Sequence, residues 1–258
     1  MKGFSFGTLA RRAIGVLSIV VAVVIAFGML HAPATKTLDP AADRATVLAE
    51  NLVRIAISPE GQAPARWDIP VRIVVGGSKP DDVGPLIVNA ARTFGRVSGV
   101  PATVVSRPED GFNVLVQVLS RADYTALVGR MGRDMEGGKY LEEHLVCYSA
   151  VISRPGGRVL LRATIAIPDD LSPADREQCA WHEMLHAFGL IDHPDDRVPS
   201  VLRDAPAPTD DDAVLLRAFY DPRIQALADG DDPLPTVRAV IAELLTTPGP
   251  GTLATTPP

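Results

Sequence analysis

The sequence of 258 residues is poor in several residue types on which particular functions depend. Aromatic residues make up only 5% of the chain, so the composition gives no indication of an aromatic platform for binding sugars. The formal net charge is −6 at pH 7, whereas domains that bind nucleic acid usually carry a basic face. We therefore expect no nucleic acid among the partners of this protein.

The sequence also lacks the known patterns of loops that bind phosphate or calcium. The paired glycines at 76–77 and 156–157 are typical of turns and do not fit a phosphate-binding pattern. The acidic runs at 195–196, 210–212 and 229–232 do not have the spacing of an EF-hand loop. We interpret these runs as solvated caps and turns.

Cysteine is scarce as well, with Cys147 and Cys179 as the two examples in the chain. In an exported protein two cysteines are expected to form a disulfide. The closed loop would stabilise the fold by about 3–4 kcal/mol on the chain-entropy model. The alternative is that Cys179 is a metal ligand, because it lies on the same face of a predicted helix as His182.

The N-terminal segment 1–32 is predicted to be a signal anchor or a cleaved signal peptide. Lys2, Arg11 and Arg12 precede an uncharged, mostly apolar run over 13–30. As a helix this run would rise about 27 Å, which is enough to cross a hydrocarbon core. The positive charges would keep the N-terminus in the cytoplasm, so we expect an exported domain in the cell envelope. This domain would be held at the cytoplasmic membrane if the segment is not cleaved, and secreted or periplasmic if it is cleaved.

The remaining chain is interpreted as a linker over 33–42, a main domain over 43–246 and a disordered tail over 247–258. Hydrophobic periodicity, glycine and proline predict an α+β fold with a twisted mixed sheet packed on helices. The expected helices are 43–57, 81–98, 121–131 (or an extended loop), 173–188, 214–220 and 237–245, and the expected strands are 71–75, 102–106, 112–119, 145–153 and 159–167.

The helix expected over 173–188 has signals at both ends. Ser172 fits an N-cap, Pro173 fits the first helical position, and Asp175 is an acidic residue in the first turn. Gly189 allows a left-handed cap that ends the helix and turns the chain sharply. The residues that follow can therefore return toward the end of the helix.

This helix carries the candidate metal site. His182 and His186 are four residues apart, so both imidazoles point to the same side and can hold one Zn²⁺, with Glu183 beside the metal as a general base. The chain has five histidines, and three of them fall within this short stretch. The third ligand would be Asp192 or His193, and the residues alone leave both possibilities open.

The run over 182–192, H-E-x-x-H-x-x-G-x-x-D, resembles the long signature of the metzincin zinc metallopeptidases. Its final aspartate resembles that of snapalysin-type secreted bacterial proteases. The resemblance implies zinc ligands at His182, His186 and Asp192 and a general base at Glu183. It also implies a zincin-like fold for the main domain and a zinc endopeptidase that acts on peptides or proteins.

Two features depart from this pattern. Metzincins place a methionine turn beneath the metal, and this chain has Ser200, Val201 and Leu202 at a suitable distance, with leucine in place of methionine. Leucine and methionine have similar volumes, so the fold can tolerate the change. The sequence also resembles an uncharacterised bacterial envelope family that often lacks the histidines, and the alternative function is a non-catalytic, zinc-stabilised binding or structural module.

Two elements near the motif have alternative interpretations. The strand at 159–167 is either the sheet edge to which a substrate peptide would pair or an ordinary core strand. Tyr220 would either reach the site and stabilise an oxyanion or be a core or surface aromatic residue.

Overall fold

The computed structural model describes residues 40–56, 65–132, 146–154, 158–228 and 230–247. They belong to one compact unit that begins at Pro40. The segment predicted to be a signal anchor and the tail after residue 247 lie outside the described residues. Within the described ranges, no helix has the length and apolar character needed to cross a membrane.

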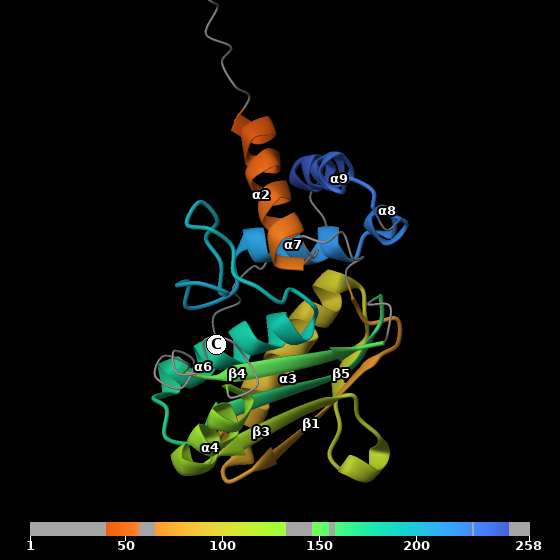
Figure 1. Cartoon of the computed structure of the whole chain (residues 1–258). Helices are drawn as coiled ribbons and strands as arrows, with labels where there is room; N and C mark the ends of the chain where they lie inside the picture. Colours follow the sequence, from red (N-terminus) through yellow and green to blue (C-terminus); the bar gives the residue numbers. More distant parts are fainter. Residues whose placement is uncertain (1–39, 57–64, 133–145, 155–157, 229, 248–258) are drawn as a thin grey trace, which may run out of the picture. The chain divides into compact units, whose positions relative to one another are not determined.

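A five-stranded mixed sheet lies at the centre of this unit (Figure 1). Its strand order is β2-β1-β3-β5-β4. The first four strands run parallel, and β4 pairs antiparallel with β5, to which a short connection joins it. The sheet confirms the predicted mixed α+β architecture. The strand bounds are β1 Val71–Gly77, β2 Ala102–Val104, β3 Val114–Leu119, β4 Tyr148–Ser153 and β5 Leu160–Pro168.

Every helix predicted from the sequence is present, with ends that differ by a few residues. Segment 121–131 is confirmed as a helix, and α2 begins at Pro40, within the segment interpreted as a linker. The short helix α8 and a 3-10 turn over Pro108–Asp110 were not predicted. The helix bounds are α2 Pro40–Ala56, α3 Pro80–Ser98, α4 Arg121–Gly132, α6 Pro173–Ala187, α7 Asp210–Phe219, α8 Pro222–Gln225 and α9 Leu234–Thr246.

The helices cover both faces of the sheet. On β3, alternate buried residues face the main core, where α3 and α6 pack, whereas Leu119 on the other face packs with Tyr124 and Val128 of α4. Helices α2, α7 and α9 pack together as a further group (Figure 1). Helix α6 contacts α3, β4 and β5, so the metal motif lies against the sheet.

Strand β5 is a core strand, because it lies between β3 and β4 and pairs with both. The interpretation of 159–167 as the sheet edge is therefore wrong, and the core alternative is confirmed. The strand beside α6 at the edge of the sheet is β4. Sequence periodicity describes one strand at a time and does not give the order of strands in a sheet.

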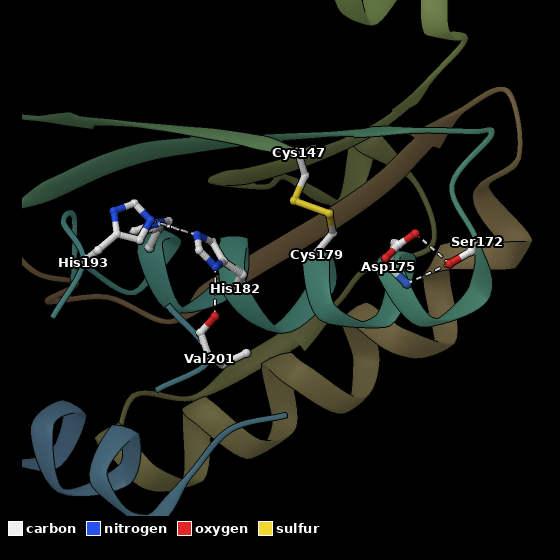
Figure 2. Close-up of a disulfide and its surroundings, with 8 residues drawn as sticks. Cys147, Ser172, Asp175, Cys179, His182, His193 and Val201 are labelled. Carbon is white, nitrogen blue, oxygen red and sulfur yellow. Dashed lines mark hydrogen bonds between the residues drawn. A yellow bond between two sulfur atoms is a disulfide. The ribbon is translucent and has the colours of Figure 1, made fainter. Parts of the chain in front are cut away.

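A disulfide joins Cys147 to Cys179, which confirms the predicted pairing (Figure 2). Both cysteines are buried. Cys147 directly precedes β4, and Cys179 lies on α6, so the bond ties the edge strand to the helix that carries the metal motif. With its sulfur in a disulfide, Cys179 is not a thiolate ligand.

Candidate metal centre

Helix α6 has the ends that its sequence predicts. The hydroxyl of Ser172 accepts a hydrogen bond from the backbone N–H of Asp175 at 3.2 Å, as an N-cap does (Figure 2). Beyond the other end, Gly189 adopts a φ of 107°. A Cβ atom at this glycine would lie 2.9 Å from the backbone oxygen of Ala65 and 2.8 Å from the ring of Phe219. Glycine is therefore required where the chain turns back toward the metal motif.

Three imidazoles meet at this end of α6, namely those of His182, His186 and His193, which we call the histidine cluster. The Nε2 atom of His182 lies 3.1 Å from the Nε2 atom of His186 and 3.2 Å from that of His193. One ligand atom from each residue falls within 4.8 Å of the others. The cluster could therefore hold a metal ion.

The other ring nitrogens determine which atoms face the metal position. The Nδ1 atom of His182 lies 2.9 Å from the carbonyl oxygen of Val201 (Figure 2). The Nδ1 atom of His186 lies 2.5 Å from the carbonyl oxygen of Leu190. A carbonyl oxygen can only accept, so each Nδ1 is the nitrogen that carries the proton and donates. The two Nε2 atoms then face each other with lone pairs and no proton between them, an arrangement that a cation stabilises.

Burial also keeps the helical histidines in the neutral form that binds metal. Desolvation lowers the pKa of His182 to about 4, against an opposing effect of its hydrogen bond to Val201. Desolvation, with a smaller contribution from His182, lowers the pKa of His186 to about 3. Both side chains are therefore uncharged at neutral pH, with Nε2 lone pairs available to a metal.

Asp192 lies beside the cluster but does not point into it. One of its carboxylate oxygens accepts the backbone N–H of His193 at 2.7 Å, and its side chain is 62% exposed. The same oxygen lies 3.6 Å from the Nδ1 atom of His193. The sequence predicts that one of these two neighbouring residues reaches the metal position. The structure brings His193 there, and the role of Asp192 as a ligand stays a prediction.

Glu183 is buried on α6, with 4% of its surface exposed. It accepts a hydrogen bond from the side chain of Ser149 on β4. Burial raises the pKa of Glu183 to about 7, and the bond from Ser149 partly opposes this shift. A carboxyl group that titrates near neutral pH can both accept and release a proton at that pH.

Two hollows open beside Glu183 and His182. One runs along β4 and is lined by residues that include Tyr148, Ser149 and Ile191. The other is lined by the disulfide and by residues that include Gln178 and Arg203. Glu183, His182 and His193 line both hollows, so a molecule in either one would contact the candidate site.

The loop predicted to lie beneath the metal supports the ring of His182. Val201 supplies the carbonyl described above, and Leu202 is fully buried. Asp212 of α7 holds this loop, because its carboxylate accepts the hydroxyl of Ser200 at 2.5 Å and the N–H of Val201 at 3.0 Å. The acidic run that contains Asp212 is interpreted from the sequence as a solvated cap. Asp212 does lie in the helix cap, but it is fully buried, because it also bonds the loop.

Tyr220 is a core residue. It is buried, and its hydroxyl donates to the backbone oxygen of Phe188 at 2.8 Å. It lines neither of the two hollows. The interpretation of Tyr220 as an oxyanion-stabilising residue is therefore not supported, and the core alternative is.

The sequence matches a family model over residues 45–227, from within α2 to just beyond α8. The chain belongs to the DUF2927 family, described as proteins of unknown function. No curated protein matches the sequence. The DUF2927 region includes the whole histidine cluster, Glu183 and both cysteines.

Proposed function

We propose that this DUF2927 protein is a zinc-dependent peptidase that hydrolyses peptide bonds outside the cytoplasmic membrane. The observation that carries the proposal is the histidine cluster, whose Nε2 lone pairs converge beside a buried carboxyl group, that of Glu183. Three nitrogen ligands leave a fourth tetrahedral position open, as in catalytic rather than structural zinc sites.

We assign His182, His186 and His193 as the zinc ligands. Zinc accepts neutral imidazole ligands, and three histidines with one open position form a known type of catalytic zinc site. Asp192 has a different place in this proposal. Its carboxylate lies on the Nδ1 side of His193, where an outer-shell carboxylate orients a histidine ligand.

The chemistry follows from the positions of the residues. When bound, zinc lowers the pKa of a water molecule and polarises the scissile carbonyl. Glu183 accepts a proton from the attacking water and later delivers it to the leaving amine. Ser149 holds the carboxyl of Glu183 by a hydrogen bond, and a nearby cation would favour the ionised, proton-accepting form.

The edge strand β4 is the proposed path of the substrate. In the described part of the sheet β4 pairs only with β5, and an extended peptide would pair with the other side of β4 in this proposal. One hollow follows β4 past Ser149 to the histidine cluster, so a peptide paired with β4 would pass the proposed zinc ligands and Glu183.

Two further observations support a zincin-like, exported enzyme. The metal helix packs against a mixed sheet with an antiparallel edge strand, and a sharp glycine turn follows that helix. The Cys147–Cys179 disulfide fits an oxidising compartment, as the predicted N-terminal signal anchor also does.

The proposal is tested by zinc content and peptide hydrolysis in the purified full-length protein. We expect one zinc per chain and hydrolysis of a mixed peptide library. Glu183→Gln should retain zinc but lose about 10²–10⁴-fold in rate, the usual contribution of a general base. A wild-type protein that holds zinc with four protein ligands and cleaves no peptide would instead support a zinc-stabilised structural or binding module.

A further inference from the structure

We infer that Asn51 of α2 is a positioning residue for His193, and that α2 fixes the loop which supplies this third ligand. The inference rests on the metal site of the proposed function. His182 and His186 are placed by the helix that carries them. His193, in contrast, lies in residues 190–197, which form no helix or strand and which we call the ligand loop.

The last turn of α2 holds the start of the ligand loop. The backbone oxygen of Ile55 accepts the N–H groups of Ile191 at 2.9 Å and Asp192 at 3.2 Å. These bonds lie directly before His193 in the sequence. Ile55 also belongs to the last turn of its helix, where carbonyl groups have no partner within the helix, so the loop satisfies a group that would otherwise be free.

Asn51 holds the loop on the other side of His193. Its side chain is 1% exposed, and its Oδ1 atom accepts the backbone N–H of Asp195 at 2.7 Å. Its Nδ2 atom donates to the carboxylate of Asp195 at 3.2 Å and to the backbone oxygen of Val47 at 2.9 Å. A buried amide that bonds both the backbone and the side chain of one residue fixes that residue closely.

Exposed contacts between α2 and the loop add less. Arg197 forms an ion pair with Glu50 at 3.1 Å, and Arg44 donates to the backbone oxygen of Arg197 at 2.9 Å. Exposed pairs of this kind contribute little to stability. Ile55 and Asn51, which are themselves buried, are therefore the two fixed points that bracket His193.

The consequence is that the metal site depends on a helix that contains none of its ligands. Without Asn51, the segment after His193 loses its buried anchor, and the bonds to Ile55 fix the loop only on the other side of His193. Outer-shell changes at metal sites typically weaken binding about 10–100-fold. We expect a loss in this range for Asn51→Ala, with the α6 histidines unaffected.

The experiment is a Co²⁺ titration of the full-length, metal-free protein, followed by visible absorption, which reports the ligands of the ion. Asn51→Ala should bind Co²⁺ about 10–100-fold more weakly and give a changed spectrum. Leu48→Ala is the matched control, because Leu48 is a fully buried α2 residue in the main core. It should lower the melting temperature but leave the affinity and spectrum unchanged.

Exchanging the side chains of Asn51 and Asp195 tests the hydrogen bond between them. It also provides a second variant in case Asn51→Ala does not fold. Asn51→Asp places two carboxylates against each other and should weaken Co²⁺ binding. Adding Asp195→Asn restores a donor and an acceptor, and should recover part of the affinity. Recovery is partial because Arg197 also donates to the carboxylate of Asp195 at 2.7 Å.

The possible results distinguish the role of Asn51 from the existence of the metal site. Equal Co²⁺ affinity and spectra for wild type and Asn51→Ala, or an equal loss in Leu48→Ala, would overturn the role of Asn51 and leave the metal site intact. If the double variant Asn51→Asp with Asp195→Asn recovers no Co²⁺ affinity, the role of Asn51 is also overturned and the metal site is left intact. A wild-type protein that takes up no Co²⁺ would overturn the metal site and the inference together.

Discussion

The candidate site has two halves that are held in different ways. In the helical half, His182 and His186 are one turn apart on α6, and their rings donate to carbonyl groups of Val201 and Leu190. In the loop half, His193 has no such helix beneath it and depends on contacts to α2. The comparison indicates that helix geometry fixes two of the proposed ligands, whereas long-range packing places the third.

The largest expected effect comes from breaking the helical half. His186→Ala should reduce zinc affinity by more than the 10–100-fold typical of outer-shell changes, because it removes one of the proposed ligands, which is buried. Isothermal titration of metal-free protein with zinc measures the effect. Wild-type affinity in this variant would contradict the assignment of His186.

Breaking the loop half separates the two candidates for the third ligand. His193→Ala should weaken zinc binding more than Asp192→Ala, because the ring of His193 contacts another imidazole of the cluster, whereas the carboxylate of Asp192 accepts the backbone N–H of His193. We expect about a 10-fold loss for Asp192→Ala, as for an outer-shell residue. The opposite order would restore Asp192 as the ligand implied by the metzincin resemblance.

Removing the disulfide between β4 and α6 tests whether the edge strand helps to position the histidine cluster. Replacing both cysteines, Cys147→Ser with Cys179→Ser, should lower the free energy of unfolding by about 2–5 kcal/mol. The histidine cluster is not bonded to either cysteine, so zinc affinity should fall less than in His186→Ala. Urea unfolding and zinc titration measure the two effects. An equal loss of zinc affinity in both variants would show that the edge strand is itself part of the ligand geometry.

The pH dependence of stability tests the burial of Glu183 in the helical half. Its folded pKa of about 7 lies above its ordinary value of 4.5, so its contribution to stability is full below pH 4.5 and is lost as pH rises through 7. The Glu183→Gln variant has no carboxyl group at this position, so it does not undergo this loss of stability. The stability of metal-free Glu183→Gln relative to wild type should therefore increase by about 3 kcal/mol between pH 4.5 and 7. Urea unfolding that shows a constant difference would contradict the burial of this carboxyl.

The same division explains what the sequence could predict. The limits of α6, the disulfide and the pairing of His182 with His186 follow from capping residues, cysteine number and helical spacing. The choice of His193 and the edge position of β4 do not, because they depend on how distant segments pack. Asn51 and Asp195, for example, are 144 positions apart, and no local pattern links them. Asp212 is a similar case. An acidic residue in the first turn of a helix fits a cap, so the local pattern does not predict that this carboxylate also holds the loop at Val201.

The most direct test of the central claim is X-ray absorption at the zinc edge of the zinc-loaded wild-type protein. The account predicts three imidazole ligands at about 2.0–2.1 Å and one water, a spectrum that His193→Ala changes and Asp192→Ala retains. Two imidazoles with a carboxylate, or four protein ligands, would contradict it.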